Sequence, residues 1–379
     1  MLDFKLTEEQ LALQELARKF AKNEMIPKAA HHDQTGEFPK EVIEKAFQLG
    51  LINFCIPAEF GGLALSNVDG IIITEELSAG CSGMSTSLMV NDLALYPIVV
   101  AGTPEQKERL LRPFTQSAKL ASFCLTEPGA GSDVAGLSTT LKKDGNGYRL
   151  NGQKMFITNA NYSSQFTVYA TMDPSLKHKG LCAVVVDAQT AGISIGKKEN
   201  KMGQRASDTA SVHFDNVRVP KENLLGRPGD GFTIAMKTLD HSRPMVAISA
   251  VGVARAAYEY ARDYSKERVQ FGKPICTYQA VQFMLADMAM SIEAGRLLCM
   301  KAAWQLDQGI RPTLIASYAK AFSADMAMKV TTDAVQIFGG YGYSKEYPVE
   351  KLMRDAKLIQ IYEGTSQIQR LVIAREILK

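Results

Sequence analysis

The chain has 379 residues, a length that suits two or three domains rather than one. Apolar residues make up 46% and charged residues 22%, the usual balance of a soluble globular protein, and the net charge of +3 is too small to indicate nucleic acid or an acidic membrane surface as a partner. No run of about 18 uninterrupted apolar residues is present, so no membrane span is predicted.

The amino-terminal stretch, residues 1–20, predicts an amphipathic helix that opens with a Thr7–Gln10 capping box, and it does not resemble a secretory signal. The six cysteines lie far apart without a C-x-x-C pair, which suits a reducing compartment and argues against a zinc site or a disulfide framework. Among the histidines only His31 and His32 are neighbours, so we expect no metal site. These features predict a cytoplasmic protein.

Residues 1–118 are predicted to be mostly helical. Apolar residues recur at three- and four-residue steps in the first helix, and Pro27 is predicted to end it. "KEVIEKAFQLG" (40–50) is a further helical stretch closed by a glycine. Thr103 is placed to cap a helix in "GTPEQKERLLRPF" (102–114), with a proline in its first turn.

Residues 119–230 have a different character. The turn signal "DGNG" (144–147) is flanked by strand-like residues, and three stretches rich in valine and aromatics follow, "FTVYATM", "LCAVVVDA" and "ASVHFDNVRVP". No helical pattern separates these strands, as a parallel sheet would require. A small β-barrel or sandwich is therefore predicted.

Residues 231–379 return to a helical pattern. Long helices are predicted over about 245–266, 278–308 and 312–338, and two shorter ones over about 348–362 and 366–378. Alanines and methionines occupy several faces of the long helices, so each is expected to bury more than one side, against another helix or another subunit. The expected class is α+β, mainly α.

"TEPGAGSD" (126–133) follows the apolar stretch "LASFCL". Its glycines match neither known phosphate-binding spacing, because no Gly-Lys-Ser/Thr is present and the third glycine of the dinucleotide motif is missing. Two glycines and a proline allow a backbone to approach a flat ligand closely, with hydroxyls from Thr126 and Ser132. A plain tight turn is the simpler interpretation of this motif alone.

Three further motifs have both a structural and a functional interpretation. "KMFITNA" (154–160) offers Phe156 to a planar ring and Thr158 to a ring heteroatom, although a phenylalanine in a β core is commoner. "RVQFGKPI" (268–275) looks like a helix end, or it places Arg268 on a pyrophosphate. "QIFGGYGY" (336–343) is either a helix-ending turn or a close backbone approach to a ligand.

"YEGTSQIQ" (362–369) places Glu363 between an apolar helical stretch and a glycine. Gly364 is predicted to end one helix, and Ser366 with Gln369 to cap the next. These roles explain the glycine, the serine and the glutamine. They leave the carboxylate unexplained. Glu363 is therefore either an incidental loop residue, or a residue whose surroundings are arranged to make its carboxylate a base.

In this order and over essentially the whole chain, these motifs resemble the acyl-CoA dehydrogenase family, with the medium-chain and short-chain members most similar. The stretches that carry the resemblance are "CLTEPGAGSDVAG", "NGQKMFITNA", "KMGQRASDTA", "ERVQFGKPI", "DAVQIFGGYGYSKEYPVEKLMRDAK" and "IYEGTSQIQRLVIAREIL". The resemblance implies an N-terminal helical domain (1–118), a central β-barrel or sandwich domain (119–230) and a C-terminal four-helix bundle (231–379). It also implies FAD between the last two domains.

By motif match, the resemblance assigns residues to FAD. The flavin is expected to contact the 123–131 backbone and nearby hydroxyls, which gives Phe123, Leu125, Thr126, Gly131 and Ser132. Phe156 and Thr158 are expected to cover one flavin face. The adenine half is expected to meet Arg268, Phe271 and Gln279 of a neighbouring subunit, joined by Gln336 and Gly340. Thr365 and Gln367 complete the expected set, and a homotetramer is expected.

Glu363 matches the catalytic base of the family, which removes the α-proton of an acyl-CoA thioester while a hydride passes from the β-carbon to flavin N5. Some relatives carry this glutamate at the position of Ser242, where serine cannot serve as the base. Substrate contacts are expected from Ser132, Asp240, Arg243, Met89, Tyr362 and Gly364. Met89 replaces an acidic residue of medium-chain relatives and no arginine is near it, which favours a neutral short-chain, medium-chain or alicyclic acyl group.

Two alternatives accompany this prediction. An acyl-CoA oxidase would have the same fold and react directly with oxygen, but such oxidases usually carry an extra C-terminal domain, and this chain ends after "AREILK". A helical assembly protein that has lost its flavin would not be expected to keep Glu363. The expected electron acceptor is electron-transferring flavoprotein. The acyl chain and the pathway are left open by the sequence.

Overall fold

The structure is a computed structural model that describes residues 5–379. The first helix begins at Glu8, and the Thr7–Gln10 capping box predicted from the sequence is present. Residues 1–4 of the predicted amphipathic stretch lie outside the described residues. Pro27 does not end this helix, because a π-helical turn carries the chain into the next helix, where the proline occupies the first turn and needs no N–H partner.

The N-terminal region is helical, as predicted. Its elements are α1 (Glu8–Phe20), η1 (Ala21–Met25), α2 (Ile26–Thr35), α3 (Lys40–Gln48), η2 (Ala58–Phe60), α4 (Asn67–Gly80), α5 (Ser82–Ala101), α6 (Pro104–Leu111) and α7 (Pro113–Gln116). Thr103 caps α6 through a capping box with Gln106. Within residues 5–379, only α5 has the length and apolarity that a membrane span requires, and 61% of its apolar window is buried inside the fold, as in a core helix.

The central region is one eight-stranded mixed sheet. Its strands are β1 (Leu120–Cys124), β2 (Thr140–Asp144), β3 (Gly147–Thr158), β4 (Ser163–Thr171), β5 (Leu181–Asp187), β6 (Ile193–Ile195), β7 (Thr209–Pro220) and β8 (Leu224–Leu225), with short helices η3 (Val134–Gly136), η4 (Pro174–Gly180) and η5 (Lys221–Asn223) between them. The order is β6-β7-β3-β2-β4-β5-β8, with β1 added beside β4. Most neighbours are antiparallel, but β4 pairs in parallel with β1 and β2, which the sequence did not predict.

The C-terminal region contains the long helices. They are α8 (Gly231–Glu267), α9 (Gln279–Asp307) and α10 (Thr313–Phe338), followed by α11 (Val349–Ile359) and α12 (Ser366–Ile377). The connections contain the hairpin β9 (Val269–Gln270) and β10 (Lys273–Pro274) and the short helices η6 (Ile275–Thr277) and η7 (Gly339–Tyr343). The helix predicted from about residue 245 begins fourteen residues earlier, at Gly231, because α8 continues through Pro244.

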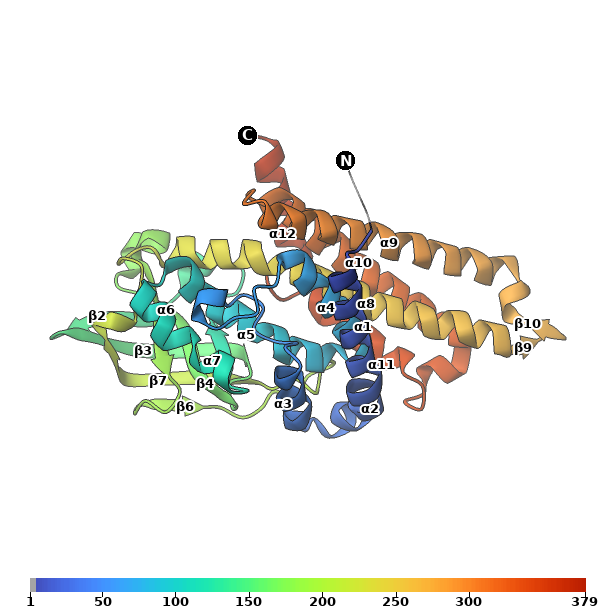
Figure 1. Ribbon diagram of the computed structural model, residues 1–379, viewed down its shortest axis with the longest axis horizontal. Helices are drawn as coiled ribbons and strands as arrows, with labels where there is room; N and C mark the ends of the chain where they lie inside the picture. Colours follow the sequence, from blue (N-terminus) through green and yellow to red (C-terminus); the bar gives the residue numbers. More distant parts are fainter. Residues whose placement is uncertain (1–4) are drawn as a thin grey trace.

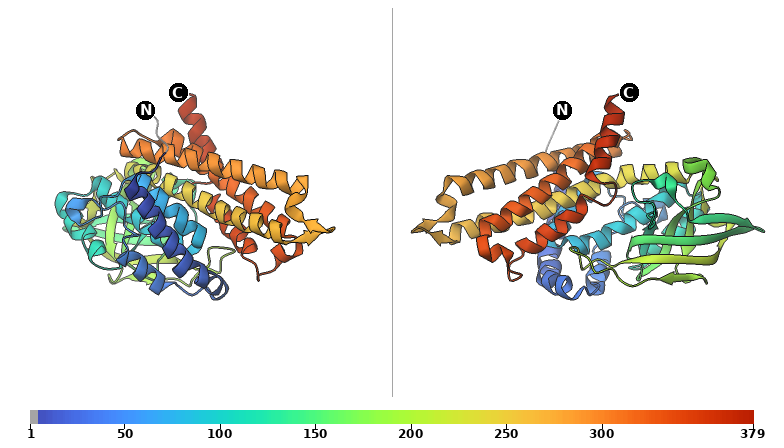
Figure 2. Two further views of the ribbon diagram at one scale, coloured as in Figure 1. Left: turned by 45° about the vertical axis from the view of Figure 1, so that its right-hand side comes forward. Right: turned by 180° about the vertical axis from the view of Figure 1, so that it is seen from behind.

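The long helices lie side by side and run away from the sheet (Figures 1 and 2). The sheet lies at one end of the molecule, the β9–β10 hairpin at the other, and α8 extends from the sheet region into the bundle. Helix α4 packs on α8 and α9, and α5 packs on α8 and β1. The three regions therefore meet around α5 and the first half of α8.

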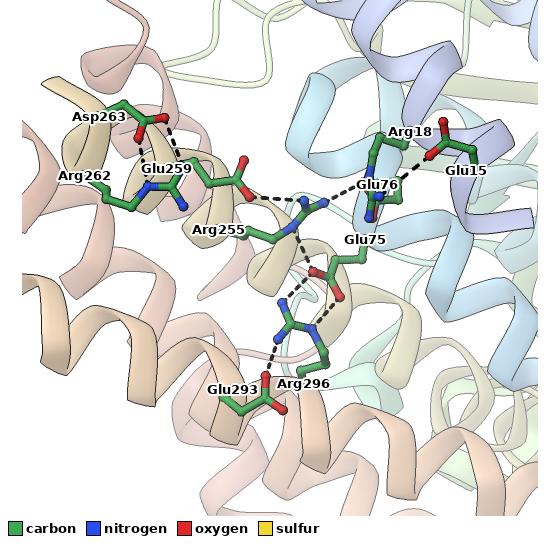
Figure 3. Close-up of polar contacts among 10 residues, drawn as sticks. All are labelled: Glu15, Arg18, Glu75, Glu76, Arg255, Glu259, Arg262, Asp263, Glu293 and Arg296. Carbon is green, nitrogen blue, oxygen red and sulfur yellow. Dashed lines mark hydrogen bonds and ion pairs between the residues drawn. The ribbon is translucent and has the colours of Figure 1, made fainter. Parts of the chain in front are cut away.

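A buried ion-pair network joins the N-terminal helices to the C-terminal bundle (Figure 3). Glu75 and Glu76, neighbours on α4, are almost fully buried. Arg255 of α8 contacts both carboxylates at 2.9 and 2.8 Å. Arg296 of α9 contacts Glu75 at 2.8 Å, and Arg18 of α1 contacts Glu76 at 2.8 Å. Four helices are thus tied together at one point.

Candidate active site

One cavity of about 660 Å³ lies where the three regions meet. Of the residues expected at a site, it is lined by Met89, Phe123, Leu125, Thr126, Gly131, Ser132, Phe156, Thr158, Arg243, Tyr362, Glu363 and Gly364. They come from α5, from β1 and the loop after it, from β3, from α8 and from the loop between α11 and α12. Residues more than 270 positions apart in the sequence therefore line the same cavity.

The loop between α11 and α12 holds Glu363 in an unusual backbone conformation. Its φ is +53°, in the left-handed region that residues other than glycine rarely adopt, and Gly364 follows with φ of +91°. Lys320 of α10 donates to the Gly364 carbonyl at 2.6 Å. Gln369 donates to the carbonyls of both Glu363 and Gly364, each at 3.2 Å. These contacts hold the loop in place.

The capping residue of α12 was predicted wrongly from the sequence. Thr365, rather than Ser366, is the N-cap residue, and its hydroxyl accepts the Ile368 N–H at 3.1 Å. Ser366 instead donates to Asp325 at 2.9 Å, and Gln369 holds the preceding loop. Both serine and threonine are good caps, so sequence alone does not distinguish adjacent ones.

The Glu363 carboxyl group is half-buried in the cavity wall. Ser242 of α8 donates to it at 2.5 Å. Burial raises the pKa of Glu363, while the Ser242 hydroxyl and the positive charges of Lys320 and Arg243 act in the opposite direction. The result is a carboxylate with a basicity above the usual value, held by one hydrogen bond.

The wall formed by β1, the following loop and β3 is open to a flat ligand. A side chain at Gly131 would meet nothing within 4 Å, so the cavity leaves its backbone uncovered. Phe156 has φ of +58° and a side chain that is 61% exposed, although it lies within a strand. Thr158 lines the same cavity two residues further on. An exposed aromatic ring beside an open glycine loop fits a planar cofactor.

A buried ion pair beneath this wall was missed by the sequence reasoning. Lys154 Nζ lies 2.7 Å from Glu127 and donates to the Leu125 carbonyl at 3.0 Å. Glu127 also accepts the N–H groups of Ser138 and Thr139 at 2.7 and 3.0 Å. The available signal was a lysine inside an otherwise apolar strand pattern. The pair fixes the loop that carries Leu125.

Other expected cofactor residues gather at a second cavity of about 530 Å³. It is lined by Arg268 and Gly340 together with Tyr264, Phe338 and Tyr341, and it shares no lining residue with the first. Arg268 follows the last residue of α8, and Gly340 lies open, with no atom within 4 Å of an added side chain. An arginine beside exposed backbone suits a phosphate-bearing ligand.

The remaining residues expected to bind FAD line neither cavity. Phe271, at the β9–β10 turn, is 95% exposed. Gln279 begins α9, Gln336 lies near the end of α10, and Thr365 and Gln367 lie at the start of α12. The single chain does not bring these five residues together.

Arg243 has an unsatisfied donor. It is buried and pairs with Asp240 at 2.6 Å, but its Nε has no hydrogen-bond partner in residues 5–379. Asp240 does not line the cavity, and it also accepts the Thr313 hydroxyl at 2.5 Å. An unpartnered guanidinium nitrogen at a cavity wall is suited to an incoming polar or anionic group.

Models of the three acyl-CoA dehydrogenase domains match the chain, the N-terminal domain over residues 7–118, the middle domain over 122–217 and the C-terminal domain over 229–378. The chain belongs to the acyl-CoA dehydrogenase family. It is accordingly an FAD-dependent oxidoreductase with acyl-CoA dehydrogenase activity. The cavity walls at Gly131 and Phe156 and the second cavity at Arg268 fit that cofactor.

Individual members of the family are similar along the full chain. The probable medium-chain specific acyl-CoA dehydrogenase 2, mitochondrial, of Caenorhabditis briggsae is 45% identical over 100% of this chain and 92% of that protein. Cyclohexane-1-carbonyl-CoA dehydrogenase of Geobacter metallireducens is 44% identical over 99% of each chain. The structure of butyryl-CoA dehydrogenase from Megasphaera elsdenii superposes with a TM-score of 0.97 at 43% identity over 100% of both chains.

Proposed function

We propose that Glu363 is the base that removes the α-proton of an acyl-CoA thioester in this enzyme. The observation that carries the proposal is its carboxyl group, which lies in the wall of the main cavity with a raised pKa. An α C–H bond is a very weak acid, so a base of increased strength is needed. FAD, when bound, supplies the acceptor for the hydride of the β-carbon.

The same loop offers a donor for the charge that develops on the thioester oxygen. The backbone N–H of Glu363 forms no hydrogen bond within residues 5–379. The left-handed conformation of Glu363 and the contacts to Gly364 fix its direction. A preorganised donor of this kind stabilises enolate-like charge without reorganisation during the reaction. We assign this role to the Glu363 amide.

We propose that the flavin contacts Phe123, Leu125, Thr126, Gly131, Ser132, Phe156 and Thr158. The adenine half of FAD is proposed to be held by a second subunit through Arg268, Phe271, Gln279, Gln336 and Gly340. Two further FAD contacts are proposed, from Thr365 and Gln367. The separation of the two cavities within one chain supports a ligand shared between subunits. The substrate is proposed to contact Asp240, Arg243, Ser132, Met89, Tyr362 and Gly364.

We propose a neutral short-chain, medium-chain or alicyclic acyl group. The α5 wall of the cavity consists of Thr86, Met89, Val90, Asp92, Leu93 and Tyr96. This wall has no cation that could pair with a terminal carboxylate. The names of the three relatives above specify different acyl groups, so they do not decide among these options.

Anaerobic bleaching of the bound flavin tests these proposals. A panel of butyryl-, hexanoyl-, octanoyl-, cyclohexane-1-carbonyl- and glutaryl-CoA is added to the oxidised holoenzyme, and loss of yellow colour is followed by stopped flow. We expect at least one neutral acyl-CoA to bleach the flavin faster than glutaryl-CoA does. If glutaryl-CoA is the fastest, the assignment of a neutral acyl group is wrong.

We propose electron-transferring flavoprotein as the acceptor, as the family resemblance implies. The oxidase alternative makes the opposite prediction for the reduced enzyme. Substrate-reduced protein is mixed either with aerated buffer or, without oxygen, with electron-transferring flavoprotein, and the return of flavin absorbance is timed. Reoxidation that is faster with oxygen than with the flavoprotein would contradict the proposal.

We propose that the chain assembles as a homotetramer. Large apolar residues with exposed side chains occur every seven residues along α9, at Phe283, Met290, Leu297 and Trp304. Large apolar residues at this spacing form one stripe along a helix, which is suited to packing against another helix. The exposed Phe271 at the tip of the bundle is a further unburied apolar group. A second copy of the chain is the proposed partner for the stripe.

A further inference from the structure

Three polar side chains of the main cavity have no part in the reaction proposed above. Asp92 and Tyr96 lie one turn apart on α5, and His241 faces the same cavity from α8. The ring centroids of Tyr96 and His241 lie 3.6 Å apart with an interplanar angle of 14°, so the two helices meet through a stacked pair. We call Asp92, Tyr96 and His241 the polar corner.

The Asp92 carboxyl group is only partly compensated. Its Oδ1 accepts the Cys55 N–H at 2.7 Å, and it forms no ion pair with any described residue. Burial raises the pKa of Asp92 to about 6, although the N–H and the thiol of Cys55 and the N–H of Phe54 favour the charged form. Keeping a carboxyl group in a largely apolar cavity without a cation is costly.

Tyr96 and His241 also keep free hydrogen-bonding capacity. Within residues 5–379, neither the Tyr96 hydroxyl nor the His241 imidazole forms a hydrogen bond. Burial lowers the pKa of His241 to about 4, so the ring is neutral at pH 7 and presents one donor nitrogen and one acceptor nitrogen. The polar corner therefore offers both acceptors and donors, and its only charge is negative.

We propose that Asp92, Tyr96 and His241 form a subsite that binds a hydroxyl group on the acyl part of the substrate. A hydroxyl donates one hydrogen bond and accepts others, which matches an aspartate beside a phenol and a neutral imidazole. A carboxylate would be repelled by Asp92. An ammonium group could pair with Asp92, but it cannot accept a hydrogen bond from the Tyr96 hydroxyl or from the imidazole N–H, whereas a hydroxyl group can. The inference rests on the proposed function, because it places an acyl-CoA in this cavity.

The simpler alternative is that Asp92 serves only to hold the loop at Cys55. Asp92→Asn separates the two roles, because an asparagine oxygen still accepts the Cys55 N–H while the group left for the cavity becomes an NH₂ donor. The loop contact, and with it the fold, should persist. Tyr96→Phe is the second variant, since it removes a hydroxyl and keeps the stacked ring. Asp215→Asn, an exposed position on β7 outside the cavity, is the matched control.

The experiment compares matched substrates in the holoenzyme. The pairs are cyclohexane-1-carbonyl-CoA with its 4-hydroxy derivative and hexanoyl-CoA with 6-hydroxyhexanoyl-CoA, and 6-aminohexanoyl-CoA is added as a third linear substrate. kcat/KM is measured with an artificial electron acceptor. We expect wild type to prefer the hydroxylated member of at least one pair, and Asp92→Asn to reduce that preference about 10-fold or more, as for loss of a hydrogen bond to a charged group. Tyr96→Phe should reduce it less, and Asp215→Asn should not change it.

Several outcomes would overturn the inference. They are a wild-type preference for the unsubstituted member of both pairs, an unchanged preference in Asp92→Asn, and faster turnover of 6-aminohexanoyl-CoA than of 6-hydroxyhexanoyl-CoA. Turnover of unsubstituted substrates with no hydroxyl preference would leave the proposed function standing and remove only the subsite. Failure of every acyl-CoA to reduce the flavin would overturn both.

Discussion

At the scale of single residues, Glu363 experiences two opposing influences. Burial disfavours its charged form, while Ser242, Lys320 and Arg243 favour it. Glu363→Gln keeps the side-chain volume and removes the base. We expect flavin content and acyl-CoA affinity to change little, and flavin reduction by substrate to slow by at least about 10²–10⁴-fold, the usual loss for a general base.

Glu222→Gln is the control for this variant, because Glu222 is an exposed residue outside the cavity. Stopped-flow reduction of the control should match wild type. A Glu363→Gln protein that binds substrate and reduces its flavin at nearly the wild-type rate would exclude Glu363 as the base.

The Ser242 hydrogen bond gives a pH prediction. Its hydroxyl lowers the pKa of Glu363, so Ser242→Ala should raise that pKa further. If Glu363 is the base, as proposed, its ionised carboxylate is the active form, and a higher pKa means that more of it is protonated at a given pH. The acid limb of the kcat profile should therefore move to higher pH. Ser265→Ala, on the same helix but outside the cavity, should leave the limb in place. A shift to lower pH in Ser242→Ala would contradict this account.

The sequence predicted Glu363 as the base from its motif and from the mismatch between a carboxylate and its apolar neighbours. It gave no sign that Ser242, 121 positions away, donates to it, or that Lys320 holds the next carbonyl. Ser242 was considered only as a position where relatives carry the base. Contacts across helices depend on the packing geometry, and a hydroxyl or ammonium group has many possible partners. The left-handed φ of Glu363 could not be predicted either, because in a sequence only glycine indicates that conformation.

At the scale of elements, the ion-pair network in Figure 3 determines how four helices meet. Arg255→Met removes the cation shared by Glu75 and Glu76, whose side chains are only 10% and 4% exposed. Breaking a buried ion pair by removing one partner costs about 3–5 kcal/mol. We expect urea denaturation to show a loss in the free energy of unfolding near that range, reduced to the extent that Arg18 and Arg296 still pair with the carboxylates.

Arg262→Met provides the comparison on the same helix. Arg262 is 40% exposed and pairs with Asp263 at 2.9 Å, and exposed pairs typically contribute about 0–1 kcal/mol. If the two substitutions lowered the free energy of unfolding equally, burial of the ion-pair network would contribute nothing to stability.

Helix positions were largely predictable, but several helix ends were not. Apolar periodicity located the long helices of the bundle. Pro27 was wrongly predicted to end a helix, since it occupies the first turn of α2, and the start of α8 was placed too late because this helix continues through Pro244. Proline removes one hydrogen bond, and in α8 packing against α4, α9 and α10 outweighs that loss. Adjacent capping residues, Thr365 and Ser366, could not be ranked without the backbone geometry.

At the scale of the whole molecule, three regions with different periodicities could be recognised from the sequence, and the cavity between them could not be described. Of the residues assigned to FAD from motifs, one group lines the main cavity, while Arg268 and Gly340 line the second cavity at the opposite end of α8. If both groups bind one FAD molecule, as proposed, they must come from different subunits. The proposed homotetramer would then be needed to complete each cofactor site.

This coupling of assembly to cofactor binding leads to the last prediction. Met290→Glu places a charge in the centre of the exposed α9 stripe, where burial against another subunit would be unfavourable. We expect light scattering to show dissociation below the tetramer, together with loss of FAD measured by the ratio of flavin to protein absorbance. Leu11→Glu, which charges an exposed leucine on α1, should leave both quantities unchanged.

Arg268→Ala should separate the two effects. It removes the cation of the second cavity without altering the α9 stripe, so we expect the tetramer to persist while FAD is held more weakly, because a charge-assisted contact to phosphate is lost. Titration of the apoprotein with FAD gives the change in Kd. A wild-type monomer that retains FAD, or an Arg268→Ala tetramer with unchanged FAD affinity, would show that the cofactor does not bridge subunits. The Arg268 cavity would then need a different ligand.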